Sequence, residues 1–428
     1  LFYFSARCRQ KGSRASQLNG WRDGGACRVI HIAAPAAAAY DPAICHCREA
    51  VVPVSLFLSV MRRVFAIALV SLFASVAQAD AAFQAWIASF CRDAVQQGIT
   101  ARTCERAFHG ITAPDTRVLE KAAYQPEFKT DAWEYIDNRV NERAISQGRF
   151  MLKEHAPLLA RLERETGVSR HVLLAIWSME SNYGAVLQDK KRLHDIPQAL
   201  ATLAYADEKR SAFGRSQLLA ALKILQAGDV SREDMLGSWA GAMGHTQFIP
   251  TSYLLYAVDA DGDGKRDIWH SVPDALASAA QLLKKNGWRS GERWGHEITT
   301  PASGQQEILA LQGDQGPVFA LQKNFFVVKR YNNADKYALA VLLLADRIAG
   351  LPAPVQDWQR PYAVLDLAGK QQLQQLLREQ GFYSGEVDGM IGDESRRAIQ
   401  RFQASAGLAE TGYPSVDVLS ALQKRQRK

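Results

Sequence analysis

The residue whose type and position best suit acid–base chemistry is Glu180. Ser169 to Gly184 predicts one helix, because serine is a preferred N-cap and glycine a preferred residue after the last turn. Glu180 follows Leu173 by seven residues, so its carboxylate lies on the apolar face, in the last helical turn. Burial and the helix dipole both favour the protonated acid there, which makes Glu180 a candidate proton donor. A buried glutamate paired with Arg or Lys, or a helix that ends before Glu180, would give the same pattern.

A second group of polar residues has the spacing of a calcium-binding loop. Positions 1, 3, 5, 6, 7 and 9 of an EF-hand loop are occupied by Asp259, Asp261, Asp263, Gly264, Lys265 and Asp267. Lys265 can offer only its backbone carbonyl, and position 12 is His270 rather than a bidentate acid, so the loop is not a standard EF-hand. Three closely spaced carboxylates repel one another unless a cation neutralises them, which favours a bound metal. An Asp-Gly-rich turn without metal is the alternative.

The first 79 residues are interpreted as leader rather than as part of a folded domain. The first methionine is Met61, and residues 61–79 have the charged start, apolar run and small-x-small cleavage site of a signal peptide. Residues 1–60 are interpreted as translated upstream DNA, so we expect the exported protein to begin at Asp80. The apolar run is shorter than the roughly 20 residues that span a bilayer, and no cysteine follows the cleavage site to carry a lipid. A soluble periplasmic protein without a transmembrane segment is therefore predicted.

Two cysteines, Cys91 and Cys104, lie outside this leader. A helix around Cys91 should end at Gly98, and Thr100 can cap a second helix that carries Cys104. The two thiols can then face each other across a helical hairpin. Because exported proteins reach an oxidising compartment, a disulfide is favoured over two buried thiols.

The rest of the chain divides into a large and a small helical unit. Residues 81–350 are rich in helical periodicity and poor in strand alternation, residues 351–365 form a proline-containing linker, and residues 366–428 carry three short helical segments. The fold class predicted is therefore mostly α. The formal charge of +7 comes largely from the leader, so the electrostatic argument for nucleic-acid binding disappears.

Three blocks of sequence resemble the B family of lytic murein transglycosylases. They are Ile176 to Gly184, Ala199 to Tyr205 and Gly237 to Phe248, supported by Gln125 to Phe128 and by Arg330 to Asn332. The resemblance covers roughly residues 83–347. It implies a lysozyme-like, mostly α-helical catalytic domain that cuts the β-1,4 bond between N-acetylmuramic acid and N-acetylglucosamine in peptidoglycan.

The same resemblance implies roles for individual residues. Glu180 matches the single catalytic acid and base, and Asp274 matches an acid that closes the calcium loop after Asp259, Asp261, Asp263 and Lys265. The residues matching substrate-binding positions are Ser238, Gln247, Tyr331, Asn332, Tyr135, Lys209 and Arg210. Some have plainer interpretations: Ser238 could permit close packing, Tyr331-Asn332 could cap a helix, and Lys209 and Arg210 could form a solvated face. The stretch 190–197 is longer than usual in the family, and Leu282 stands where an aromatic residue is often found.

The carboxy-terminal unit resembles a three-helix peptidoglycan-binding module. Its signature is Gly381 to Gly392 followed by Ala398 to Gln403, over residues 366–423. Its glycines also suit turns with positive φ, so the fold alone would explain them. Too small for a demanding active site, the unit is expected to bind rather than to react.

Together these features predict an exported lytic transglycosylase that binds peptidoglycan glycan strands. It is expected to act as a monomer, without a catalytic cofactor, and with a structural Ca²⁺. The product would carry a 1,6-anhydromuramic acid end. The alternatives are a hydrolytic muramidase, which ordinarily needs a second carboxylate roughly 5 to 9.5 Å from the acid, and a catalytically inactive wall-binding scaffold. Asp207 and Glu208 remain possible second carboxylates.

Overall fold

The computed structural model describes residues 81–123, 130–298 and 307–427. The predicted signal peptide, the residues before it and the motif Gln125 to Phe128 lie outside the described residues. None of the described helices is both long and apolar enough to cross a membrane.

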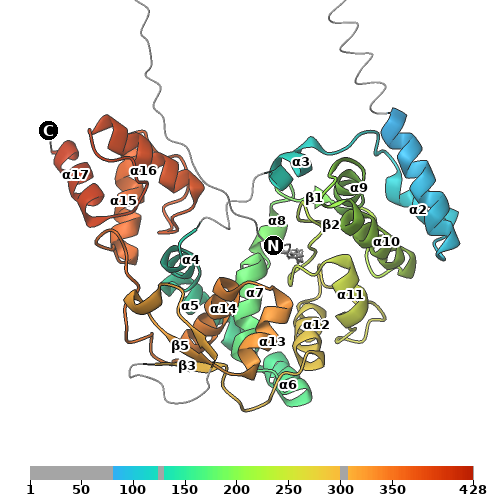
Figure 1. The fold of residues 1–428 in the computed structure, drawn as a ribbon, viewed down its shortest axis with the longest axis horizontal. Coiled ribbons are helices and arrows are strands. Elements are labelled where there is room, and N and C mark those ends of the chain that lie inside the picture. The colour runs from blue at the N-terminus through green and yellow to red at the C-terminus, as the bar shows by residue number, and fades with distance from the viewer. Residues whose placement is uncertain (1–80, 124–129, 299–306, 428) are drawn as a thin grey trace, which may run out of the picture. The chain divides into compact units, whose positions relative to one another are not determined.

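The first unit is built almost entirely from helices (Figure 1). A helix over residues 81–96 comes first. It is followed by α2 (Ala101–Phe108), α3 (Thr116–Ala123), α4 (Ala132–Arg139), α5 (Glu142–Glu154), α6 (Ala156–Thr166), α7 (Arg170–Ser181), α8 (Ala185–Gln188), α9 (Ile196–Ala206), α10 (Ser211–Ala227), α11 (Pro250–Tyr256), α12 (Val272–Lys285), α13 (Lys323–Tyr331) and α14 (Asp335–Ile348). The predicted mostly α class is confirmed.

Short strands join some of these helices. The first pair, β1 (His194–Asp195) and β2 (Leu236–Gly237), is antiparallel. A three-stranded antiparallel sheet has the order β3-β5-β4, with β3 (Gly295–Glu297), β4 (Glu307–Leu309) and β5 (Phe319–Leu321), and a 3-10 turn, η2 (Gly313–Gln315), precedes β5. The sequence pattern does not predict this sheet, because strands of three residues are too short to show alternation.

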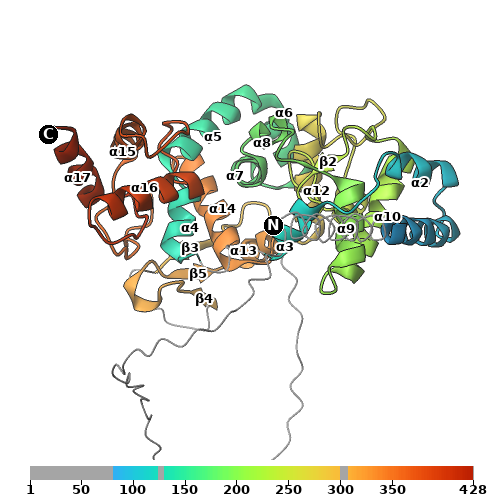
Figure 2. The same cartoon turned by 90° about the horizontal axis from the view of Figure 1, so that it is seen from above.

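The core of the large unit forms around α7. Every residue from Val172 to Trp177 is buried, so this helix is surrounded by protein on all sides for most of its length. Its main neighbour is α14, which is also buried along most of its length and packs in addition on α4, α5 and α13. The two helices lie side by side in both views (Figures 1 and 2). Since α14 touches each of these helices, it connects the end of α7 to residues far away in the sequence.

The carboxy-terminal helices form a separate small core. They are α15 (Leu367–Glu379), α16 (Asp393–Ser405) and α17 (Val416–Gln426), at the red end of the chain in Figure 1. Its most buried apolar residues are Leu373, Leu377, Ala398, Ile399, Phe402 and Leu422.

The linker predicted at residues 351–365 is irregular but closely bound to the large unit. Trp358 is 8% exposed and belongs to the main hydrophobic core. The Glu297 carboxylate accepts hydrogen bonds from the backbone N–H groups of Val355 and Gln356, at 2.6 and 2.8 Å. These contacts leave the linker little freedom to act as a flexible tether.

Candidate active site

Glu180 lies in the last turn of α7, where the helix ends abruptly. The next three residues, Asn182, Tyr183 and Gly184, all have positive φ, at 48°, 57° and 86°. This conformation is strained for a bulky residue such as Tyr183, and strained backbone of this kind is often found at functional sites. The predicted helix from Ser169 to Gly184 is thus three residues shorter at its end, and Glu180 remains inside it.

The carboxylate of Glu180 is held by a tyrosine from α14. The hydroxyl of Tyr337 donates a hydrogen bond of 2.5 Å to Glu180 Oε1. Burial is the main cause that raises the pKa of the Tyr337 hydroxyl well above its usual range, so Tyr337 remains a proton donor. Its bond occupies one carboxyl oxygen and leaves the other for a ligand.

The electrostatics of Glu180 favour a protonated acid. Burial raises the pKa of its carboxyl above the ordinary value. The hydrogen bond from Tyr337 and the positive charge of Arg139 lower the pKa, but burial has the larger effect. No carboxylate of the described residues contributes to the shift. Glu180 is therefore a buried acid with a raised pKa, and no hydrogen bond among the described residues joins it to a second carboxylate.

The end of α7 is hydrogen-bonded to His245 of the Gly237–Phe248 block. Ser181 Oγ donates to the His245 carbonyl at 2.7 Å and accepts from the Gly184 N–H at 3.0 Å. Trp177 Nε1 donates to His245 Nδ1 at 3.1 Å. A side chain on Gly184 would overlap the His245 ring, so this glycine is required for the close approach.

Tyr331 and Asn332 lie where α13 ends, next to the same block. Both are buried, and the Tyr331 hydroxyl donates a hydrogen bond of 2.5 Å to the Thr246 carbonyl. The Tyr331 ring also stacks on Tyr337, with ring centroids 6.4 Å apart. Tyr331 thus connects the block to the tyrosine that holds Glu180.

Ser238 and Gln247 use their side chains within the block. Ser238 Oγ accepts a hydrogen bond from the Ala242 N–H at 2.9 Å. Gln247 Nε2 donates to the Gly244 carbonyl at 2.8 Å, and Gln247 itself has a left-handed φ of 49°. Both side chains stabilise the turn, and both remain partly exposed.

Tyr135 lies on α4, which packs on α14. Its side chain is partly buried against the main core, and the Arg139 guanidinium lies over its ring at 5.8 Å from the centroid. The negative charge of Tyr135, were it ionised, would further raise the pKa of Tyr337. Tyr135 and Arg139 are therefore close to the Glu180–Tyr337 pair.

The predicted basic pair lies in the turn between α9 and α10. Lys209 is exposed. Arg210 forms an ion pair of 2.6 Å with Asp207 and lies over the ring of Trp239, 5.7 Å from its centroid. Arg210 is thus next to Ser238 in the block, but no hydrogen bond or ion pair among the described residues joins the basic pair to Glu180. Asp207 is engaged in the ion pair with Arg210, and no hydrogen bond among the described residues joins Asp207 or Glu208 to Glu180.

The acidic loop brings its carboxylates together between α11 and α12. Ligand oxygens of Asp259, Asp261, Asp263 and Asp274 lie within 4.8 Å of one another, and Asp274 is fully buried. Asp274 accepts hydrogen bonds from the N–H groups of Ala260 at 2.8 Å and Asp267 at 2.7 Å. Burial nevertheless raises the pKa of Asp274, an effect that a cation would oppose. This donor set suits a hard divalent cation such as Ca²⁺.

Cys91 and Cys104 form a disulfide in the structure, with their Cα atoms 6.0 Å apart. The bridge joins the helix over residues 81–96 to α2. Thr100 caps α2 by accepting from the Thr103 N–H, as the sequence suggests.

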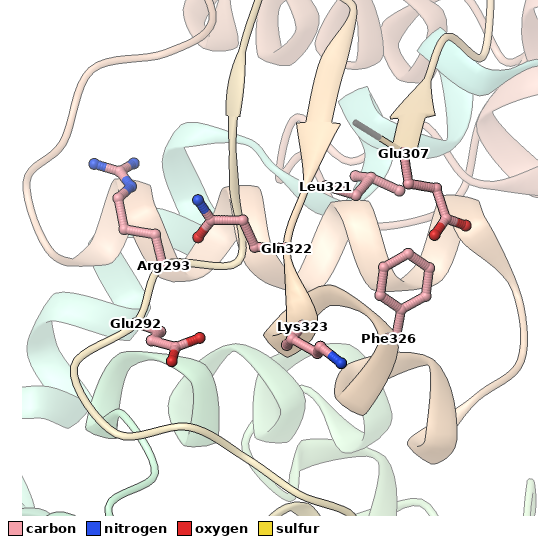
Figure 3. A pocket seen from close by; sticks show the side chains of 7 residues that line it. All are labelled: Glu292, Arg293, Glu307, Leu321, Gln322, Lys323 and Phe326. Atoms are coloured by element: carbon pink, nitrogen blue, oxygen red, sulfur yellow. The ribbon is translucent and has the colours of Figure 1, made fainter. Parts of the chain in front are cut away.

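A hollow of about 790 Å³ lies elsewhere in the same unit (Figure 3). It is lined by Glu292, Arg293, Glu307, Leu321, Gln322, Lys323 and Phe326. Lys323 begins α13, whereas Tyr331 ends it, so the hollow is at the opposite end of this helix from the Glu180 group. We assign it no part in the chemistry of Glu180.

The comparison with known families decides the class of protein. Residues 82–312 and 301–346 match the transglycosylase SLT domain family. The chain belongs to this family. Residues 369–422 match a second family, described as a putative peptidoglycan binding domain. The predicted family, the enzyme class and the lysozyme-like helical fold with a small binding module are confirmed, and the chain is a lytic transglycosylase.

Individual relatives support the assignment. Membrane-bound lytic murein transglycosylase B of Escherichia coli (strain K12) is 28% identical over 270 residues, which cover 55% of this chain and 72% of that protein. A crystal structure of SltB3 from Pseudomonas aeruginosa, in complex with NAG-anhNAM-pentapeptide, is 39% identical. It covers 80% of this chain and 99% of that chain, with a TM-score of 0.62. The Escherichia coli lytic transglycosylase Slt35, solved in complex with calcium, is 22% identical, covers 61% of this chain and 92% of that chain, and has a TM-score of 0.52. At this identity Slt35 shows the fold alone.

Three residues of the site were not assigned a role from the sequence: Tyr337, Arg139 and His245. His245 falls within the Gly237–Phe248 block but carries no signal of its own. A tyrosine within the buried helix Asp335–Ile348 is itself a signal, because its hydroxyl needs a partner. Which partner it finds depends on a contact 157 residues away in the sequence.

Proposed function

We propose that this chain cleaves the β-1,4 bond between N-acetylmuramic acid and N-acetylglucosamine in peptidoglycan without consuming water. The observation that carries the proposal is the state of Glu180: a lone carboxyl, raised in pKa by burial and bonded at one oxygen to Tyr337. A carboxyl in this state can first donate a proton and then accept one. The SltB3 relative, solved with an anhydro-muramic product, supports the assignment of the substrate.

In the first step the Glu180 proton passes to the glycosidic oxygen. The bond between muramic acid C1 and this oxygen breaks, and the N-acetylglucosamine side leaves with the proton. The developing positive charge at C1 is stabilised by the carbonyl oxygen of the substrate's own N-acetyl group, because no second carboxylate of the described residues acts on Glu180.

In the second step Glu180 acts as a base. Its carboxylate takes the proton from the C6 hydroxyl of muramic acid, and the C6 oxygen bonds to C1 to close a 1,6-anhydro ring. Glu180 thereby regains its proton, so that one residue completes the cycle. Tyr337 donates to Oε1 throughout, which leaves Oε2 to carry the proton in both steps.

Digestion in ¹⁸O water tests this mechanism against the hydrolytic alternative. The anhydro product should carry no label, whereas stoichiometric ¹⁸O at the reducing end would identify a muramidase. Glu180→Gln keeps the shape but cannot transfer the proton, so turnover should fall by about 10²- to 10⁴-fold or more. Wild-type protein that binds sacculi but releases no product would identify an inactive scaffold.

We further propose that the acidic loop binds a structural Ca²⁺. Asp259, Asp261, Asp263 and Asp274 would supply carboxylate oxygens, and Lys265 its backbone carbonyl. The ion would screen the repulsion among these carboxylates and stiffen the segment before α12. No step of the reaction depends on it.

Export to the periplasm is also proposed, on the signal-peptide pattern of residues 61–79. Intact-mass analysis of the periplasmic protein should give a chain that starts at Asp80. A precursor containing residues before Met61 would contradict the proposed start.

A further inference from the structure

The helix α4 contacts the peptidoglycan-binding module through one side. Glu134 forms an ion pair with Arg396 of α16, and both side chains are largely buried, at 18% and 20% exposure. Trp133, which is 3% exposed, packs edge-on against Tyr413 of the module at 5.7 Å between ring centroids. An aromatic contact and a largely buried ion pair thus hold the module on two successive residues of α4.

Neighbouring residues extend this contact. Asp137 of α4 accepts two hydrogen bonds of 2.7 Å from the Arg360 guanidinium of the linker. Arg143 of α5 forms an ion pair of 2.7 Å with Asp388 of the module. Paired guanidinium–carboxylate contacts of this type fix orientation as well as distance. The module therefore has a defined position on α4 and α5.

The other side of α4 carries two residues that act on the Glu180–Tyr337 pair. Tyr135 and Arg139 are one helical turn apart, and the Arg139 guanidinium lies over the Tyr135 ring. This helix packs on α14, whose Tyr337 is hydrogen-bonded to Glu180. Through this packing the Arg139 charge lowers the pKa of Glu180, and Tyr135 acts electrostatically on Tyr337. Tyr135 is also the immediate neighbour of Glu134 in the sequence, so the two sides of α4 cannot move independently.

We propose that the peptidoglycan-binding module positions Tyr135 and Arg139 relative to the Glu180–Tyr337 pair by holding the opposite side of α4. The module then has two functions: it retains the enzyme on the cell wall, and it keeps the catalytic site in its active geometry. This inference rests on the proposed role of Glu180. It differs from simple tethering, because a tether acts through effective concentration and leaves the turnover of a small soluble substrate unchanged.

The short length of α4 makes this coupling physically reasonable. The helix has eight residues, so a shift at Trp133 and Glu134 is transmitted to Tyr135 and Arg139 as movement of a rigid body. Displacements of about 1 Å near reacting groups can cost about 10²-fold in rate. The ion pair with Arg396 is therefore well placed to act on turnover although it makes no contact with Glu180.

Charge reversal at this ion pair tests the proposal in the full-length protein. Arg396→Glu and Glu134→Arg should each lower kcat on a short soluble glycan by roughly 2- to 30-fold. The double variant, which restores an ion pair in the opposite orientation, should recover most of the loss. The matched control is Arg397→Glu, an exposed position on the same helix for which no ion pair is found, and it should keep wild-type kcat. Thermal unfolding of each variant shows whether it is folded, and Arg396→Gln replaces Arg396→Glu if the latter is not.

A second comparison shows whether the effect passes through α4. In an Arg139→Gln background, Arg396→Glu should lower kcat much less than in the wild type, because the group that it positions is already absent. Retention on insoluble sacculi is measured in parallel. Loss of retention with unchanged kcat, or full additivity of the two substitutions, would overturn the inference. Absence of anhydro product from the wild type would instead contradict the proposed function.

Discussion

The hydrogen bond between Tyr337 and Glu180 gives the sharpest prediction. Tyr337→Phe removes one oxygen and leaves the ring, which is 4% exposed and stacks on Tyr331, in place. The acid loses the 2.5 Å bond to Oε1. This bond strengthens as the proton leaves and the carboxyl becomes negative, so its loss weakens the transition state more than the ground state.

A hydrogen bond to a charged group contributes about 1.5 to 3 kcal/mol, so kcat should fall by about 10- to 150-fold. The pH profile should change as well. Because the Tyr337 bond lowers the pKa of Glu180, its removal raises that pKa further. The acid stays protonated to higher pH, and the alkaline limb of kcat/KM should move upward.

The assay is the pH dependence of anhydro-product formation from a short soluble glycan, followed by mass spectrometry. Tyr331→Phe is the matched control, since it removes a hydroxyl from the same stack that bonds to Thr246 rather than to Glu180. It should lower stability and leave the alkaline limb in place. An alkaline limb that stays fixed or moves downward in Tyr337→Phe would refute the assigned role of the bond.

Three further predictions concern stability. Calcium at 100 times its Kd should raise the free energy of unfolding by about 2.7 kcal/mol. Asp261→Ala should abolish this gain without loss of kcat at temperatures well below the Tm. Loss of activity in a fully stable Asp261→Ala variant would contradict a structural ion. Replacing Cys91 and Cys104 by serine should lower the free energy of unfolding in urea by about 3 kcal/mol, whereas an unchanged value would mean that the bridge is absent or strained. Burial lowers the pKa of His245 to about 4, so the unfolded chain binds the extra proton and stability should fall as the pH decreases from about 6.5 to about 4. His245→Gln should remove that part of the acid sensitivity, and an unaltered pH dependence would show that other groups cause it.

Structural features that depend only on residues close together in the sequence could be predicted. The helix with Glu180 in its last turn follows from residues within 16 positions of one another, although Ser169 makes no capping hydrogen bond through its side chain. The pairing of Cys91 with Cys104 across a hairpin is local as well. In both cases helical spacing alone places the side chains. The alternation of aspartates in the loop from Asp259 to Asp263 is equally local.

Contacts between distant segments could not be predicted in the same way. Glu180 meets Tyr337 across 157 residues, and Arg360 meets Asp137 across 223. Sequence spacing carries no information on such pairs, because they depend on how whole helices pack. The three-residue strands of the β3-β5-β4 sheet were missed for a related reason: each is too short to show a pattern, and the sheet exists only through pairing.

The two-step use of Glu180 explains why its surroundings come from three separate helices. An acid that donates a proton must be protonated before the reaction begins, which requires a raised pKa. Burial at the end of α7 provides it. The same group must then exist as a carboxylate long enough to take the proton from the C6 hydroxyl, and burial alone would oppose this. The hydrogen bond from Tyr337 on α14 and the charge of Arg139 on α4 both stabilise the carboxylate. Moving α4 or α14 away from α7 would therefore favour the protonated form of Glu180 and destabilise the carboxylate that acts as the base. Catalysis thus requires the packing of all three helices.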